Sequence, residues 1–251
     1  MLCPFRRLLA AAALVSLGFA ANPAAGLVLL TEENPPFNYT EKGKVVGMAT
    51  EIVGEMAKRA KLPATIQMLN WDDAYVRAQA ERGTCVFSTS RLENRERLFA
   101  WVGPIATNLW AIYGRGDFAA PIRTLKDLQP FRIGAVTRDA KGEFLRENGV
   151  TNVTSVRIDS DNPPRLMLPK DDPNAIDLWI SGLYAGRDLA KAAKVSDVKL
   201  VFIAAEQPLY LACSPQTPPA IVKGLAEALE TLKADGTVKR ITADYEARFA
   251  K

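Results

Sequence analysis

The 251-residue sequence contains no histidine, and this absence excludes several kinds of chemistry. A Ser-His-Asp or Cys-His nucleophile pair, a histidine general base and a zinc site with histidine ligands all require an imidazole. The chain also lacks a run of five or six charges of one sign, although 32 basic and 28 acidic side chains give it a formal charge of +4. Such runs are typical of nucleic-acid-binding arms. We therefore expect neither histidine-dependent catalysis nor a nucleic-acid partner.

The chain also lacks an apolar stretch of the roughly 20 residues that are needed to span a bilayer. Its apolar stretch from Leu8 to Ala21 is shorter, and it lies between Arg6-Arg7 and the small residues of Pro23-Ala24-Ala25. A charged start, an apolar centre and a small-residue junction are typical of a secretory signal peptide, whereas a permanent anchor needs a longer stretch. We predict a signal peptide over residues 1–25 and a soluble mature chain in the periplasm.

Cysteine is scarce, and Cys3 lies in the predicted signal peptide, which leaves Cys85 and Cys213. Both lie in apolar runs of strand length. We expect two buried free thiols, and a disulfide in an oxidising compartment is the alternative. Two cysteines without histidine do not make a metal site, and the chain has neither a Walker-type loop nor a GxGxxG fingerprint. We therefore expect no metal and no cofactor.

Strand-like apolar runs alternate with helical patterns along the chain, which is typical of an α/β fold. The predicted strands cover residues 27–30, 65–69, 85–87, 132–136, 153–158, 176–180 and 200–203. The predicted helices cover residues 47–61, 140–148 and 182–194. Another predicted helix is capped by Asp72 or Asp73 and runs to residue 82, and two apolar stripes at helical spacing predict two more helices near the C-terminus. Apolar crossings at 101–113 and 202–212 would join two such layers and leave a cleft between them, where ligands bind beyond the strand ends.

Seven polar or aromatic side chains follow predicted strands: Glu32, Phe37, Trp71, Ser90, Arg95, Arg138 and Asp139. Free amide groups at a helix N-terminus favour an anion, and guanidinium groups favour a carboxylate. The set therefore suits a small acid with a cationic or polar end. Other interpretations stay open, because Trp71 could belong to the core, Ser90 could cap a helix, and the arginines from Arg91 to Arg97 could lie on a solvated face.

Three stretches of the chain carry a resemblance to a known family. They are Pro35 to Tyr39 with the helix after Gly47, the stretch from Ser88 to Pro104, and the closing stretch from Glu230 to Thr237. They resemble the periplasmic solute-binding proteins of polar amino acid ABC importers. The resemblance implies a two-lobed type II fold of the α/β class, in which each lobe is a mixed sheet flanked by helices and two hinge crossings join the lobes. Lobe 1 would comprise residues 26–107 and 209–251, and lobe 2 residues 108–208.

The resemblance also implies roles for several side chains. Arg95 takes the place of the arginine that grips the carboxylate of the ligand, and Ser90 that of a hydroxyl residue beside it. Trp71 matches an aromatic side chain that covers the ligand. Arg138 and Asp139 lie in the loop of the second lobe that closes on the carboxylate.

Two positions depart from the family pattern. The aspartates that commonly hold the amino group of the ligand are replaced by Ser181-Gly182 and by Thr31 or Glu32. Either Glu32 substitutes for them or the ligand lacks a standard amino group.

We therefore predict a monomeric periplasmic binding protein, not an enzyme, for a small carboxylate-bearing, amino-acid-like solute. Phe37 and Trp71 would pack against the solute, and an inner-membrane ABC permease would receive it. One alternative is an enzyme on the same scaffold, such as a cyclohexadienyl dehydratase, with Glu32 as general acid or base. Another alternative is a receptor module that passes the closed state to a signalling partner.

Overall fold

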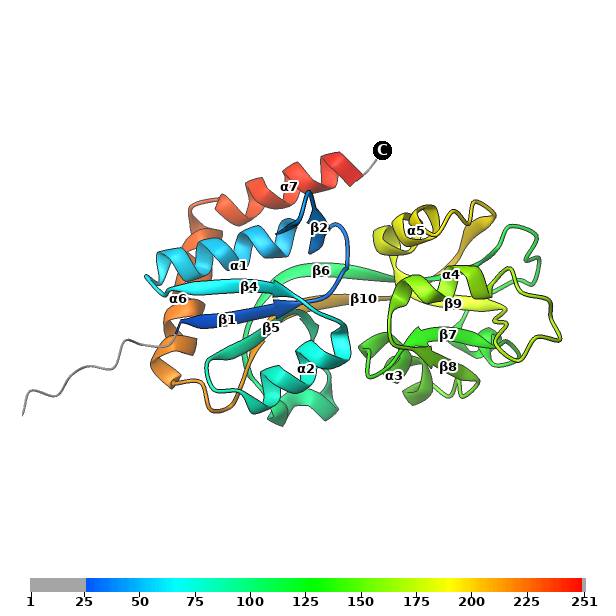
Figure 1. Ribbon diagram of the computed structural model, residues 1–251, viewed down its shortest axis with the longest axis horizontal. Helices are drawn as coiled ribbons and strands as arrows, with labels where there is room; N and C mark the ends of the chain where they lie inside the picture. The colour runs from blue at the N-terminus through cyan, green and yellow to red at the C-terminus, as the bar shows by residue number, and fades with distance from the viewer. Residues whose placement is uncertain (1–25, 250–251) are drawn as a thin grey trace, which may run out of the picture.

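The computed structural model describes residues 26–249, and the predicted signal peptide lies outside them. One eight-stranded sheet runs through the molecule (Figure 1). In spatial order its strands are β4 (Ala64–Met68), β1 (Leu27–Thr31), β5 (Thr84–Ser90), β10 (Val198–Cys213), β6 (Ala100–Arg115), β9 (Leu178–Gly182), β7 (Ile133–Val136) and β8 (Val153–Val156). The strands pair in parallel toward both ends of the sheet and antiparallel in the middle, so the sheet is mixed, as predicted.

The two long strands in the middle of the sheet are the predicted crossings. Strands β6 and β10 pair antiparallel from Val198 opposite Arg115 to Cys213 opposite Ala100. Figure 1 shows both running from one side of the molecule to the other. We call the side with β4, β1 and β5 lobe 1 and the side with β9, β7 and β8 lobe 2. The predicted boundaries at 107/108 and 208/209 fall nearly opposite each other in this ladder, and they stay a prediction.

Lobe 1 has helices on both faces of its strands. These helices are α1 (Met48–Arg59), α2 (Trp71–Ala80), α6 (Pro219–Ala234) and α7 (Thr237–Phe249), and a small hairpin of β2 (Tyr39–Glu41) and β3 (Lys44–Val46) lies beside them. Leu29 packs in one apolar cluster with α1 and α6, whereas Leu30 packs in another with α2. Successive side chains of a strand point to opposite faces, so β1 is apolar from Leu27 to Leu30 because both of its faces are covered.

The start of α2 differs from the prediction. Asn70 is at the cap position and makes no side-chain cap, while Asp72 and Asp73 lie inside the first turn. Acidic side chains there still stabilise the helix through its dipole. The helix ends at Ala80 and not at residue 82.

Lobe 2 carries α3 (Ala140–Glu147), the short α4 (Asn162–Arg165) and α5 (Leu183–Ala192) around its strands. Three 3-10 helices, η1 (Glu93–Leu98), η2 (Leu125–Leu128) and η3 (Asp159–Asp161), lie in the connections. The run predicted as a strand at 200–203 belongs to the long β10, and β9 extends to Gly182. None of the helices within residues 26–249 has the length and apolar character of a membrane span.

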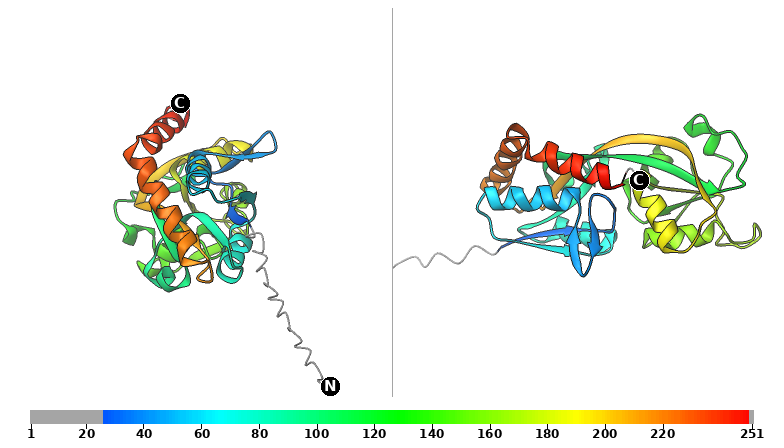
Figure 2. Two further views of the ribbon diagram at one scale, coloured as in Figure 1. Left: turned by 90° about the vertical axis from the view of Figure 1, so that its left-hand side faces the viewer. Right: turned by 90° about the horizontal axis from the view of Figure 1, so that it is seen from above.

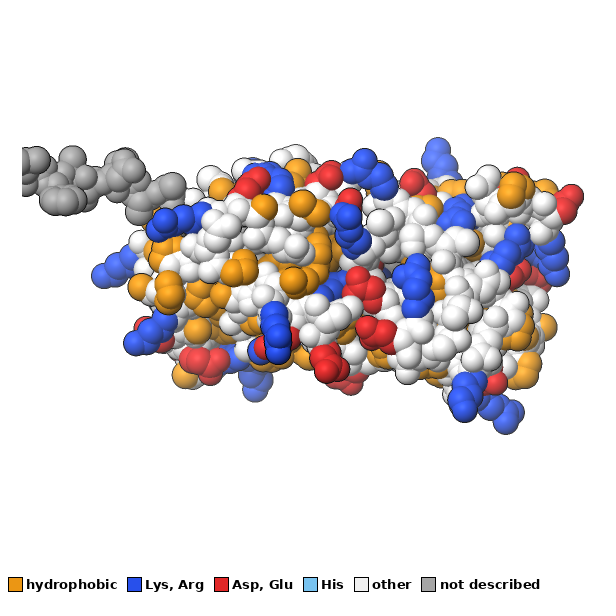
Figure 3. All heavy atoms as spheres, turned by 90° about the horizontal axis from the view of Figure 1, so that it is seen from below, with side chains coloured by type: hydrophobic (Ala, Val, Ile, Leu, Met, Phe, Trp, Pro, Cys, Tyr) orange, Lys and Arg blue, Asp and Glu red, His pale blue; other side chains and the backbone are white. Residues whose placement is uncertain are grey.

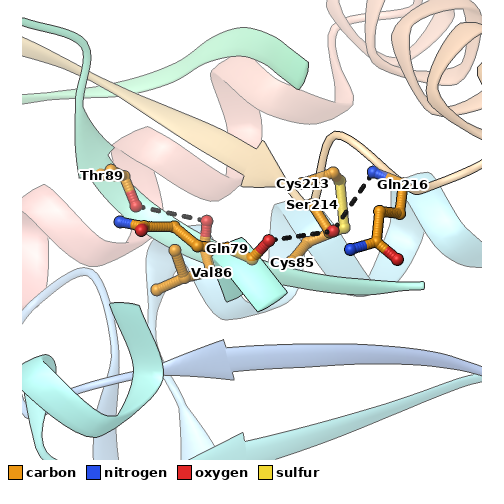
Figure 4. Close-up of a disulfide and its surroundings, with 7 residues drawn as sticks. All are labelled: Gln79, Cys85, Val86, Thr89, Cys213, Ser214 and Gln216. Carbon is orange, nitrogen blue, oxygen red and sulfur yellow. Dashed lines mark hydrogen bonds between the residues drawn. A yellow bond between two sulfur atoms is a disulfide. The ribbon is translucent and has the colours of Figure 1, made fainter. Parts of the chain in front are cut away.

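Cys85 and Cys213 form a disulfide between β5 and β10 (Figure 4). The expectation of two free thiols was therefore wrong. The two residues lie directly opposite each other in the antiparallel β5–β10 pair, and both are fully buried. The sequence spacing could not reveal this pairing, because 128 positions separate the two cysteines and only the strand register brings them together.

Candidate functional site

A cavity of about 20 Å³ lies where the lobes meet, and five of the seven predicted site residues line it. These five are Glu32, Trp71, Ser90, Arg95 and Asp139. The first four come from lobe 1 and Asp139 comes from the start of α3 in lobe 2. The structure thus brings together residues that lie more than a hundred positions apart in the chain, and their role as ligand contacts stays a prediction.

Arg95 is the most deeply buried charged group on this cavity, with 1% of its surface exposed. Its Nε and Nη2 atoms donate to the Glu143 carboxylate of α3 at 3.1 and 2.8 Å, and Nη2 also donates to the backbone carbonyl of Arg138 at 2.7 Å. The rings of Tyr75 and Trp71 lie 5.1 and 5.8 Å from the guanidinium carbon. Its Nη1 atom is buried and has no hydrogen-bond partner among residues 26–249. Arg91 and Arg97, by contrast, are exposed.

The Arg138 carbonyl is a second point at which the lobes touch. Besides the bond from Arg95, it accepts a hydrogen bond of 2.9 Å from Nε1 of Trp71. Arg138 has a φ of 56°, in the left-handed region that side chains other than glycine rarely adopt. Strained backbone of this kind often occurs at functional sites. The Arg138 side chain does not line the cavity, since it is 55% exposed and pairs with Asp72.

Phe37 does not line the cavity either, and its predicted packing against the solute stays a prediction. Its side chain is 3% exposed and belongs to the apolar core of lobe 1 with Met48 and Ile52. Its carbonyl accepts hydrogen bonds from Ala49 and Thr50 at the start of α1. An apolar residue after a strand end fits both a core position and a cleft position, so its residue type alone could not separate them.

Two charged residues that the sequence analysis did not select lie beside the predicted ones. Lys141 lines the cavity, is 9% exposed, and its Nζ donates to Asp139 Oδ2 at 2.7 Å. Asp159 accepts hydrogen bonds from Trp179, Ser181 and Asn162 at 2.8, 2.6 and 3.1 Å. Lys141 had a detectable signal, because a lysine in the first turn of a helix opposes the helix dipole.

The charges of this cluster shift one another's pKa values. Burial, together with the charges of Asp139 and Asp159, raises the pKa of Glu32 to about 8, so this carboxyl is protonated at neutral pH. Burial also raises the pKa of Asp159. Burial alone would lower the pKa of Lys141, but the surrounding carboxylates raise it overall and keep the ammonium charged.

A larger chamber of about 430 Å³ shares Glu32 and Trp71 with the small cavity as common walls. It is also lined by Tyr39, Arg157 and Asp159, among other residues. The cleft between the lobes therefore has a narrow inner part and a wider outer part. The inner part is polar and deeply buried, and the outer part has room for the remainder of a solute.

Contacts at the rim hold the lobes together around this cleft. Asp72 and Asp73 of α2 pair with Arg138 and Arg157 of lobe 2. Figure 3 shows acidic and basic side chains close together in the middle of the face seen from below. On another side, the end of α7 reaches α5 (Figure 2), where the Phe249 ring lies 6.4 Å from that of Tyr184. The structure is thus a closed arrangement of the lobes.

Comparisons with known proteins agree with this architecture. The family model for bacterial extracellular solute-binding proteins, family 3, matches residues 27–247. No curated protein matches the chain. These findings and the mixed sheet confirm the predicted type II two-lobed α/β fold.

Many solved structures resemble the chain, and the three described here are each under 25% identical, so they show the fold alone. A histidine kinase sensor domain with similarity to periplasmic binding proteins is 18% identical, covers 88% of this chain and 95% of its own, and has a TM-score of 0.77. The arginine-, lysine-, histidine-binding protein ArtJ from Geobacillus stearothermophilus is 15% identical, with 90% and 100% covered and a TM-score of 0.75. A mutant of ArgBP from T. maritima is 16% identical, with 88% and 96% covered and a TM-score of 0.74.

Proposed function

The chain belongs to the bacterial extracellular solute-binding proteins, family 3, and we propose that it captures a small carboxylate-bearing solute between its lobes for delivery to an inner-membrane ABC permease. The names of ArtJ and of an amino acid ABC transporter binding protein among the similar structures support an amino-acid-like solute. The predicted signal peptide and the disulfide support a location in the periplasm, since disulfides persist in oxidising compartments.

One observation carries this proposal: Arg95 lines a cavity between the lobes, and its Nη1 atom is a buried donor without a partner in the part of the chain that the structure describes. Most buried polar groups have partners, and an unsatisfied one costs about 1–3 kcal/mol. A carboxylate oxygen of a solute would remove that cost and gain a charge-assisted hydrogen bond. The hydroxyl of Ser90, which also lines the cavity, would be a second donor to the same group.

Solute entry requires the lobes to separate. The cavity of about 20 Å³ is too small for an amino acid, and Arg95 is almost fully covered. Strands β6 and β10 join the lobes through the middle of the sheet, so bending there would open the cleft. A solute that contacts Arg95 in lobe 1 and the start of α3 in lobe 2 binds the closed form better than the open form. It therefore shifts the population toward closure, which a permease can recognise.

The test is calorimetric titration of the mature chain after a thermal-shift screen of amino acids and small organic acids, because a ligand that binds only the native state raises its melting temperature. For a ligand so identified, we expect Arg95→Ala to weaken binding by about 2–5 kcal/mol, or roughly 30-fold to several-thousand-fold. Arg97→Ala is the matched control, since Arg97 is exposed two positions away. Unchanged affinity in Arg95→Ala would remove this residue from the site and contradict the proposal.

A second candidate function is ligand sensing. The similarity to a histidine kinase sensor domain supports it, because the same closed state could be read by a signalling partner instead of a permease. Transport assays separate the two candidates. Loss of solute uptake on deletion of the protein supports import, whereas unchanged uptake with loss of a transcriptional response supports sensing.

A third candidate is an enzyme that uses the same cleft. Shifted pKa values at Glu32 and Lys141 in one cleft are the observation that favours it, because such groups often act as acids and bases. Turnover of prephenate or arogenate by the mature chain would support this candidate. Stoichiometric binding without product would support a binding protein.

A further inference from the structure

Lys141 occupies a position that is unfavourable unless it serves the site. It is the second residue of α3, where the positive end of the helix dipole repels an ammonium group. It is also 9% exposed, and burying a charge is costly without partners. The chain nevertheless directs this side chain to the cavity between the lobes. The stabilising partners therefore have to be found among the carboxylates of the cleft.

Those partners surround the ammonium group. Asp139 Oδ2 accepts a hydrogen bond of 2.7 Å from Lys141 Nζ, and the charge of Asp159 also favours the protonated amine. An ammonium group among several carboxylates is the environment that the amino group of a solute would need in this cleft. Here the chain itself supplies the ammonium group.

Each carboxyl group of the cluster already has partners within the described residues or is protonated. Both oxygens of Asp139 accept from Lys141, one from Nζ and one from the backbone amide, each at 2.7 Å. Asp159 accepts from three neutral side chains of lobe 2. Glu32 has a pKa of about 8 and is protonated at neutral pH, so it is a donor there. Glu33 and Asp188 line the outer chamber and not the small cavity.

Hydrogen-bond donors, in contrast, remain in excess on the small cavity. Arg95 Nη1 has no hydrogen-bond partner among the residues that the structure describes. Lys141 Nζ has three N–H groups, and within the described residues one hydrogen bond, to Asp139, accounts for one of them. The protonated Glu32 carboxyl adds another donor at neutral pH. This inner cavity therefore suits a solute that brings oxygen acceptors.

We propose that the solute is a small carboxylate with an oxygen substituent in place of the amino group, such as a 2-hydroxy or 2-oxo acid, and that Lys141 sets this preference. The carboxylate binds Arg95, and the oxygen on the neighbouring carbon accepts a hydrogen bond from Lys141. An amino acid would place its ammonium group against that of Lys141, and this repulsion excludes it. The inference rests on the proposed function, because it assigns a chemical class to the same site.

Matched ligands test the preference without any change to the protein. The first series is L-alanine, L-lactate and pyruvate, and the second is L-glutamate, 2-hydroxyglutarate and 2-oxoglutarate. Within each series only the group on the second carbon differs. In calorimetry on the mature wild-type chain, we expect an oxygen-bearing member to bind at least about tenfold more tightly than its amino counterpart, as expected for one hydrogen bond to a charged group. An amino acid that binds as tightly or more tightly overturns the inference.

A variant tests whether Lys141 is the cause. Lys141→Met keeps the length of the side chain and removes its charge, so we expect it to lose affinity for the oxygen-bearing acid by about tenfold or more and to gain affinity for the amino acid, because Asp139 is released. Lys126→Met at an exposed position is the control. An unchanged order of affinities in Lys141→Met would overturn the role of this residue, whether or not the variant is less stable.

The outcomes also separate this inference from the proposed function. If an amino acid binds tightly to the wild type and this binding is lost in Arg95→Ala, the proposed function stands. The preference for an oxygen substituent is then refuted. Binding of an oxygen-bearing acid that does not depend on Arg95 refutes the proposed carboxylate contact. If none of the six compounds or the screened acids binds, both conclusions fail.

Discussion

Removal of the Cys85–Cys213 disulfide should cost the protein a large part of its stability. The bond closes a loop of about 130 residues, since the two cysteines are 128 positions apart. The loop-closure relation gives an entropy of about −17 cal/mol/K for the unfolded chain, which corresponds to about 5 kcal/mol at 25 °C. Typical domains are stable by only about 5–15 kcal/mol. The double variant Cys85→Ala, Cys213→Ala should therefore unfold at a much lower urea concentration than the oxidised wild type.

The assay is urea unfolding, followed by circular dichroism, of the oxidised wild type, the reduced wild type and the double variant. Removal of a native disulfide from a secreted domain typically costs about 2–5 kcal/mol, so we expect a loss in this range in the double variant. A reductant should destabilise the wild type and leave the variant unchanged. A difference under about 1 kcal/mol would refute the entropic reasoning. Two reactive thiols in the urea-unfolded, unreduced wild type would refute the disulfide itself.

Two further predictions concern the cleft. Glu32→Gln should flatten the dependence of the melting temperature on pH. The pKa of Glu32 is raised to about 8 in the folded protein, so between about pH 4.5 and 8 the folded protein keeps a proton that the unfolded chain has released. The stability of the wild type therefore falls as the pH rises through this window. Thermal unfolding at pH 5 and pH 8 measures this, with Glu33→Gln as the control, and equal slopes for wild type and Glu32→Gln would contradict it. Arg138→Ala should change ligand affinity by less than about fivefold in calorimetry, because the exposed ion pair of Arg138 is worth about 0–1 kcal/mol. The variant also retains the backbone carbonyl that contacts Trp71 and Arg95. A loss of affinity as large as that of Arg95→Ala would place the Arg138 side chain in the site.

The fold was predictable because its signals are local. The continuous apolar run from Leu27 to Leu30 and the helical stripe of α1 each depend on neighbours within a few residues. The two long apolar segments that became β6 and β10 were also visible, although their full lengths were not. Periodicity of this kind shows which face of an element is covered, and it does not show by what.

The residues of the candidate site were predictable only where the residue type and the position in the chain both pointed to the cleft. Arg95 was distinguished from Arg91 and Arg97 by its position in the family pattern, and the structure finds it alone of the three buried. Arg138 was assigned as part of the loop of the second lobe, and in the structure its backbone carbonyl contacts Trp71 and Arg95. Lys141 was overlooked, because a lysine near a helix start is most often a solvated side chain and its burial depends on the opposite lobe.

By itself, the sequence determined the α/β class, the two crossings and the exclusion of histidine chemistry, and it predicted Arg95 as the contact for an acid group. Only the tertiary structure decided which charges face one another across the cleft and that Cys85 bonds Cys213. The physical reason is distance along the chain. Hydrophobic periodicity acts over a few residues, whereas the cluster of Glu32, Arg95 and Lys141 and the register of β5 against β10 exist only after segments more than a hundred positions apart have packed together.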